Sequence, residues 1–168
     1  MMQCTTLASP FGILKIFADE RNLYQISLPA DEKALPAHLA PETHPLLSSA
    51  KTQLAEYFAG QRQIFELPLV LQGTSFQKAV WAAMLKIPYG ETRTYAFIAA
   101  QLGHPNKARA VGQAASRNPL PIVIPCHRVI GCSGKLTGFS GGLKIKKYLL
   151  ALEKSIATRV GFLTQELP

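Results

Sequence analysis

The spacing of apolar residues changes near residue 73, and this change most limits what the chain can fold into. Before it, short strand-like segments alternate with turn signals at residues 10–12 and 19–22. The segments are Thr5–Leu7, Gly12–Ala18 and Leu23–Leu28. Such a pattern predicts an antiparallel meander. After residue 73, apolar residues recur at helical spacing between capping residues, so we expect an α+β fold with two unlike halves.

One helix is expected in the first half. A connection containing Pro29, Pro36, Pro41 and Pro45 favours an extended, exposed path over regular structure. Apolar residues then follow helical spacing from 46 to 58, where Gly60 can end the helix. We interpret residues 1–72 as an N-terminal α/β domain with a short antiparallel sheet, and nothing in it suggests chemistry.

Three helices are expected in the second half. Thr74 or Ser75 can cap the first, with Trp81 in its core face. Thr94 can cap a second helix over 95–102 that Gly103 closes, and a third runs from about 107 to 116. The last two resemble a helix-turn-helix, whose second helix enters a DNA groove. We expect residues 73–155 to form a mostly helical, winged-helix-like DNA-binding domain, followed by a C-terminal tail over 156–168.

Charge divides at the same place. Residues 1–73 hold 5 Lys/Arg and 7 Asp/Glu, whereas residues 74–155 hold 12 and 2. A solubilising surface explains the net charge of +8 equally well, but it does not explain the segregation. A basic segment joined to a mildly acidic one is typical of a nucleic-acid-binding domain with a partner domain.

Composition excludes several other classes. No apolar run reaches the length of a membrane span, and the first residues do not read as a secretion signal. Cys4, Cys126 and Cys132 are too few for a disulfide framework, and no pair has the spacing of a zinc site. We therefore expect a cytoplasmic protein without a metal.

The third predicted helix carries Arg109 among small residues that include Ala108 and Gly112. Small side chains permit close approach to DNA. They also suit tight packing in a core, which is the commoner reason for Ala and Gly. The helix alone leaves both readings open.

The strongest chemical candidate is Cys126. It lies with His127 and Arg128 at a bend in an apolar, strand-like run over 120–130, which Pro121 and Pro125 make rigid. A thiol attacks as its thiolate, which a neighbouring cation or base favours. Adjacent strand residues point to opposite faces, so a bend or a bridging water would have to connect the cysteine to the histidine.

A histidine base also needs an orienting carboxylate. The basic half contains only Glu91 and Glu153, and Glu153, near the end of the last helix, is the better candidate. Without wider context, a cysteine in an apolar run is usually a buried hydrophobe. Cys132 is interpreted as a small loop residue.

The run Pro125-Cys126-His127-Arg128-Val129, preceded by Asn118-Pro119-Leu120-Pro121 and followed by Gly138-Phe139-Ser140-Gly141-Gly142, resembles the O6-alkylguanine-DNA alkyltransferase family. The resemblance covers residues 73–153, whereas the first half matches in layout alone. Further matching motifs are Thr74-Ser75-Phe76-Gln77, Val80-Trp81, Ile87-Pro88-Tyr89-Gly90, Thr94-Tyr95, Ile98-Ala99, Ala108-Arg109-Ala110-Val111-Gly112 and Leu149-Leu150.

The resemblance implies DNA repair by direct, stoichiometric transfer of an alkyl group from O6-alkylguanine to Cys126, without a cofactor. O4-alkylthymine is a second candidate substrate. His127 would draw the thiol proton through a water molecule, and Glu153 would orient His127. Asn118 would tie the recognition helix to the reactive strand.

The resemblance also implies how DNA is held. Tyr95 would help turn the nucleotide out of the duplex and assist proton transfer to the leaving guanine, and Arg109 would fill the space left. Ala108, Gly112 and Ser140 join them as expected DNA contacts. The expected partner is double-stranded DNA bound through its minor groove by a monomer. Phe139 stands where the family often has a tyrosine, so the base pocket loses a hydroxyl.

Three other functions compete with alkyl transfer. A lesion-binding protein on the same scaffold would lack the acceptor, but Cys126 is present. A transcription factor would need more long polar side chains on its recognition helix. A cysteine hydrolase would explain Cys126 and His127 but not the segregated charge.

Overall fold

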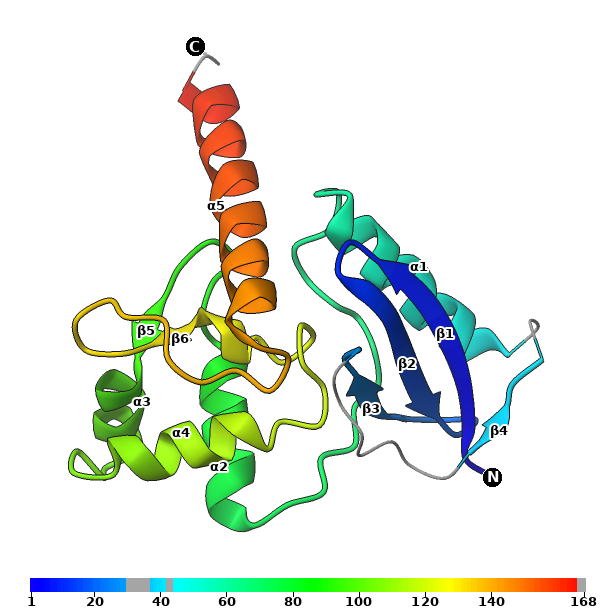
Figure 1. The fold of residues 1–168 in the computed structure, drawn as a ribbon, viewed down its shortest axis with the longest axis horizontal. Helices are drawn as coiled ribbons and strands as arrows, with labels where there is room; N and C mark the ends of the chain where they lie inside the picture. The colour runs from blue at the N-terminus through cyan, green and yellow to red at the C-terminus, as the bar shows by residue number, and fades with distance from the viewer. Residues whose placement is uncertain (30–36, 42–43, 166–168) are drawn as a thin grey trace.

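The protein folds into two halves that lie side by side (Figure 1). The computed structural model describes residues 1–29, 37–41 and 44–165, with side chains through Gly161. The first half is a small sheet with one helix, and the second half is mostly helical. The predicted α+β class is therefore confirmed.

The predicted meander forms the sheet of the N-terminal half. Strands β1 (Gln3–Ser9), β2 (Gly12–Ala18) and β3 (Leu23–Ser27) pair in antiparallel order. A fourth strand, β4 (His38–Leu39), runs parallel to β1 at the edge of the sheet. This strand lies in the connection that was expected to lack regular structure. It forms because carbonyl groups at the free edge of β1 accept its backbone hydrogen bonds. Pro36 lies outside the described residues.

Helix α1 (Pro45–Phe58) lies alongside the sheet in Figure 1. His44 caps it by accepting a hydrogen bond from the amide of Leu47, and Gly60 ends it with a φ of +73°. Its apolar face is buried against the core. Tyr57, in its last turn, is fully buried and points toward the C-terminal half.

Capping residues place the helices of the second half where they were expected. Helix α2 (Ser75–Leu85) begins with a reciprocal capping box at Thr74. Helix α3 (Tyr95–Gln101) is capped by Thr94, and helix α4 (Ala108–Ser116) follows after a tight turn. The indole of Trp81 is 1% exposed and donates to the carbonyl of Ala114, so it fastens α2 to α4.

The run over 120–130, expected to be strand-like, is mostly a compact turn. Ile122 has a φ of +76°, and Cys126–Arg128 form a short 3₁₀ helix, η1. Two prolines cannot donate to a strand ladder, so the chain folds back and buries its apolar side chains. Only its end, β6 (Val129–Ile130), pairs as a strand, in parallel with β5 (Arg93–Thr94).

Helix α5 (Leu143–Gln165) is longer than expected. It continues through most of the predicted tail, so Glu153 lies near its middle rather than near its end. No proline interrupts it, and its second half contacts turns from both halves of the protein. A methyl group at Gly60 would come within 2.6 Å of Ile156, and one at Gly90 within 2.8 Å of Ala157.

Among the described residues, no helix combines the length and the hydrophobicity that a membrane span requires.

Candidate active site

Cys126 is held in η1, at the junction of the two halves. Its side chain is 5% exposed. Asn118, just after α4, donates to the carbonyl of Ile124 at 2.8 Å and accepts from the amide of Leu120 at 2.9 Å. One side chain thus fastens both ends of the turn that contains Ile122. The link expected of Asn118 is present, although it reaches a turn instead of a strand.

The thiol is protonated at rest. Burial raises the pKa of Cys126, and hydrogen bonding to Asn118 and the nearby charge of Lys146 oppose this shift without cancelling it. A buried neutral thiol is a poor nucleophile, because the thiolate is the attacking form. The site therefore needs a base.

His127 is placed to be that base. His127 and Glu153 are both fully buried, with His127 Nε2 2.7 Å from Glu153 Oε1. The carboxylate selects the tautomer with hydrogen on Nε2, which leaves Nδ1 free to take a proton. Burial lowers the pKa of His127, and the charges of Arg128 and Lys146 lower it further, while Glu153 acts in the opposite sense. The imidazole is thus neutral at pH 7.

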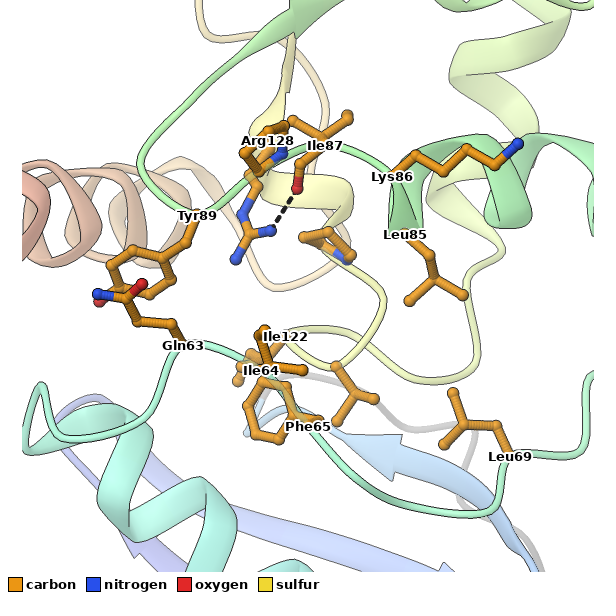
Figure 2. Close-up of a pocket in the computed structure, with 13 residues that line it drawn as sticks. Gln63, Ile64, Phe65, Leu69, Leu85, Lys86, Ile87, Tyr89, Ile122 and Arg128 are labelled. Atoms are coloured by element: carbon orange, nitrogen blue, oxygen red, sulfur yellow. Dashed lines mark hydrogen bonds between the residues drawn. The ribbon is translucent and has the colours of Figure 1, made fainter.

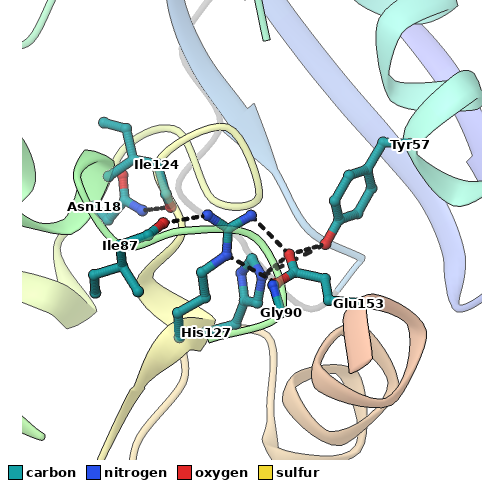
Figure 3. Close-up of polar contacts among 8 residues, drawn as sticks. Tyr57, Ile87, Gly90, Asn118, Ile124, His127 and Glu153 are labelled. Carbon is teal, nitrogen blue, oxygen red and sulfur yellow. Dashed lines mark hydrogen bonds and ion pairs between the residues drawn. The ribbon is translucent and has the colours of Figure 1, made fainter. Parts of the chain in front are cut away.

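Glu153 is the centre of the polar network (Figure 3). Besides His127, it accepts hydrogen bonds from Tyr57 Oη at 2.7 Å and from the amide of Gly90 at 3.1 Å. Arg128 binds it with two nitrogens, at 2.8 and 2.9 Å. Burial would raise the pKa of Glu153, but hydrogen bonds and charge from His127 and Arg128 lower it to about 2. The carboxylate is ionised.

Arg128 acts differently from the sequence-based expectation. It was a candidate cation for activating Cys126, yet its guanidinium pairs with Glu153 and donates to the carbonyl of Ile87 at 2.7 Å. In a 3₁₀ turn, consecutive side chains point in directions about 120° apart, which separates Arg128 from the thiol. Its charge lowers the pKa values of Glu153 and His127.

Lys146 is a buried residue that the sequence did not indicate as part of the site. It is fully buried, and its Nζ donates to the carbonyls of Val129, Thr137 and Gly138 at 2.6, 3.1 and 3.3 Å. It also approaches Tyr95 Oη at 3.4 Å. In sequence it stands in a lysine-rich run typical of a surface. Its helical spacing from Leu149 and Glu153 was the available signal that it faces inward.

A groove of about 460 Å³ brings together four of the expected DNA-contacting residues, Tyr95, Ala108, Arg109 and Gly112. Tyr95 Oη donates to the carbonyl of Thr137 at 2.9 Å, and burial raises its pKa. Arg109 is exposed. Of the small residues on α4, Ala114 and Ala115 are buried and pack in the core, whereas Ala108 and Gly112 line the groove.

Ser140 does not line this groove. It is exposed and borders a separate depression of about 370 Å³ together with Asn118. Cys132 is exposed at the rim of the first groove and is not disulfide-bonded.

Another cavity, of about 490 Å³, is lined by residues of both halves (Figure 2). Phe65 and Leu69 border it from the N-terminal half, and Ile122 and Arg128 from the C-terminal half. Cys126 is not among its lining residues. Within the described residues, no cluster of three or more His, Cys, Asp or Glu side chains could hold a metal ion.

Two further contacts could not be found from sequence. Tyr57 comes from a helix that gave no chemical signal, and Gly90 contributes its backbone amide. Both depend on tertiary packing, between the two halves for Tyr57 and within the C-terminal half for Gly90, which local patterns do not encode.

Comparison with known proteins gives matches to one family in both halves of the chain. Residues 75–155 match the model of the 6-O-methylguanine DNA methyltransferase DNA-binding domain, and residues 2–71 match that family's ribonuclease-like domain. A methylated-DNA–protein-cysteine methyltransferase of Mycobacterium tuberculosis is 47% identical over 163 residues, covering 94% of this chain and 95% of the relative. A constitutive enzyme of that name from Bacillus subtilis is 46% identical over 155 residues, covering 89% and 94%.

A solved structure agrees. The Mycobacterium tuberculosis OGT protein, crystallised in complex with DNA, superposes with a TM-score of 0.84 at 44% identity, covering 92% of this chain and 93% of that one. The chain therefore belongs to the 6-O-methylguanine DNA methyltransferase family.

Proposed function

We propose that this protein repairs alkylated DNA by transferring an alkyl group from the O6 atom of guanine to the Sγ atom of Cys126, once per molecule. The observation that carries this proposal is the hydrogen bond between His127, the residue after Cys126, and Glu153. In it, a neutral imidazole is oriented by an ionised carboxylate. The names of the relatives, which describe transfer from methylated DNA to a protein cysteine, support it.

DNA binding would use α4 and the basic half of the chain. Residues 74–155 hold 12 Lys/Arg against 2 Asp/Glu, enough for sequence-independent phosphate contacts that weaken as salt rises. Ala108 and Gly112 keep the groove-facing side of α4 small, which suits the minor groove. The relative solved with DNA supports DNA as the partner.

The target base must leave the helix before it can react. Flipping a nucleotide costs about a few kcal/mol. Arg109, exposed on α4, would occupy the space left in the duplex and so offset part of this cost. Tyr95, at the groove, would help turn the nucleotide toward the thiol.

The chemistry then follows from the network. The thiol proton passes through a water molecule to Nδ1 of His127, whose Nε2–H group stays hydrogen-bonded to the ionised Glu153. The thiolate attacks the alkyl carbon, the carbon–O6 bond breaks, and its electron pair remains on guanine. Tyr95 supplies a proton to the leaving base. The product is a thioether without an acidic proton or a labile bond, so the reaction ends after one turnover.

We propose that the protein works as a cytoplasmic monomer, with residues 1–72 as an N-terminal domain and 73–155 as the DNA-binding alkyltransferase domain. Cys4, Cys126 and Cys132 are all free thiols, which accords with a reducing compartment.

The test is to incubate the protein with a duplex containing O6-methylguanine and to analyse its peptides by mass spectrometry. We expect the peptide containing Cys126 to gain one methylene stoichiometrically, without turnover. Repair by Cys126→Ala would overturn the assignment. Tight binding without transfer by the wild type would instead indicate a lesion-binding protein.

A further inference from the structure

Tyr57 belongs to the N-terminal half, yet its hydroxyl reaches the centre of the candidate active site. It lies in the last turn of α1 and is fully buried. Its Oη donates to Glu153 Oε1 at 2.7 Å and lies 3.5 Å from His127 Nε2 (Figure 3). The N-terminal half therefore supplies a hydrogen-bond donor to the carboxylate that orients the base.

Three donors meet at the same carboxylate oxygen. Glu153 Oε1 accepts from Tyr57 Oη, from His127 Nε2 and from Arg128 Nη2 at 2.9 Å. Each donor withdraws electron density from that oxygen, so each weakens its attraction for the proton on the other two. The Tyr57 hydroxyl consequently limits how strongly Glu153 favours a positive charge on His127.

The ring of Tyr57 is fixed independently of its hydroxyl. It packs against Phe58, Phe65 and Tyr89, with centroid distances of 5.6, 5.5 and 6.1 Å. Removing the hydroxyl therefore leaves the ring in place. The effect of the hydrogen bond can then be separated from the effect of packing.

We propose that Tyr57 is a positioning residue for alkyl transfer: its hydroxyl holds the Glu153 carboxylate in register with His127 and keeps His127 neutral before the reaction. This inference rests on the proposed function, and it assigns the N-terminal half a direct part in the chemistry. Tyr57 touches no reacting atom and acts through Glu153.

The other charged and titratable groups around His127 come from α5 and η1. Glu153 and Lys146 face it from α5, and Cys126 and Arg128 flank it in η1. Tyr89, from the segment after α2, contacts the Tyr57 ring and lies under the Arg128 guanidinium at 5.5 Å. All of these groups remain when the Tyr57 hydroxyl is removed.

The test compares Tyr57→Phe with Tyr89→Phe. The first variant loses the hydrogen bond to Glu153. The second loses a neighbouring buried hydroxyl for which the described residues offer no hydrogen-bond partner, so it is a matched control. Two readouts are needed: the single-turnover rate of methyl transfer as a function of pH, and the titration of the His127 ring nitrogens by NMR without DNA.

In Tyr57→Phe, Glu153 keeps four donors, namely His127 Nε2, two nitrogens of Arg128 and the amide of Gly90. It stays ionised, and its freed oxygen attracts the His127 proton more strongly. We expect the His127 titration and the acid limb of the rate profile to move upward together, by roughly half a pH unit. Loss of the hydrogen bond that positions the Glu153 carboxylate should add to the effect of this shift, so that transfer at neutral pH slows about tenfold, equivalent to about 1.4 kcal/mol.

Tyr89→Phe should change neither readout. A slower Tyr57→Phe with an unmoved His127 titration would show a merely structural role and overturn the proposal, as would equal effects in the two variants. Failure of the wild type to methylate Cys126 would refute the proposed function instead. The NMR titration needs no substrate, so these two failures are distinguishable.

Discussion

Replacing Arg128 by Met should destabilise the protein and protonate His127. The guanidinium is buried, with a side chain 7% exposed, and makes two hydrogen bonds to Glu153 and one to Ile87. Removing one partner of a buried ion pair costs about 3–5 kcal/mol, because the other charge is left uncompensated. His127 can offset part of this cost by taking up a proton, so we expect a loss of about 3 kcal/mol at pH 7.

The sign of the pH dependence follows from the same contacts. In the wild type the pKa of His127 is lowered by burial, with Arg128 contributing. The stabilising effect of the neutral His127 is therefore lost as pH falls below the pKa that His127 has in the unfolded chain. In Arg128→Met the pKa should lie above the unfolded value. Its stabilising contribution is then complete at low pH and lost as pH rises through the folded pKa. The destabilisation should therefore shrink between pH 8 and pH 6.

Denaturant unfolding at several pH values measures this directly, with Arg93→Met as the matched control. Arg93 pairs with Glu91 at 2.7 Å, but the two side chains are 34% and 50% exposed. Solvent screens such a pair, so its loss should cost less than about 1 kcal/mol and show little pH dependence. If Arg128→Met costs no more than this control, or if its cost grows as pH falls, the buried-charge argument is wrong.

Two further predictions concern the carboxylate and the turn. The pKa of Glu153 is about 2, against an ordinary 4.5, so its stabilising effect is present above pH 4.5 and lost as pH falls toward 2. The wild type should therefore lose stability relative to Glu153→Gln over that range. The difference in their unfolding free energies should shrink by about 3 kcal/mol. Asn118→Ala removes two hydrogen bonds to buried backbone. It should cost about 2 kcal/mol in denaturant unfolding, and alkylation of Cys126 by iodoacetamide should need a higher pH, because Asn118 helps to lower the thiol pKa. An unchanged alkylation profile would contradict that role.

Local signals were enough to predict most helices and the sheet. Thr74 and Thr94 each cap a helix by a hydrogen bond within three residues, and Gly60 and Gly103 take the left-handed backbone that follows a helix end. These interactions depend on neighbours in sequence. The strands β1 to β3 were found for the same reason, because short turns join them.

The turn around Cys126 was not predictable in this way. Its apolar run looks like a strand, but Ile122 adopts a positive φ that a β-branched residue rarely takes. Such a conformation costs about 1–3 kcal/mol and persists only when its surroundings enforce it. Asn118 and two prolines supply that enforcement, so the decisive contacts are specific to the folded structure.

The site residues that could be predicted are those whose side chains have a recognisable chemical role. Cys126, His127 and Glu153 are the residue types that a thiol, its base and an orienting carboxylate require. Lys146 and Tyr57 were missed because one looks like a surface lysine and the other like a core aromatic. Their roles appear only when α5 and α1 pack around η1.

The network also bears on the reactivity of the resting thiol. In a hydrolase triad, an unpaired carboxylate favours the imidazolium. Here Arg128 already compensates Glu153, and Lys146 adds a second positive charge, so a resting ion pair between Cys126 and His127 is disfavoured. Burial independently keeps the thiol neutral. A protein that reacts once gains from this arrangement, because a neutral, buried thiol reacts slowly with electrophiles in solution. The proposed transfer then requires a bound substrate, so that proton movement to His127 accompanies attack on the alkyl carbon.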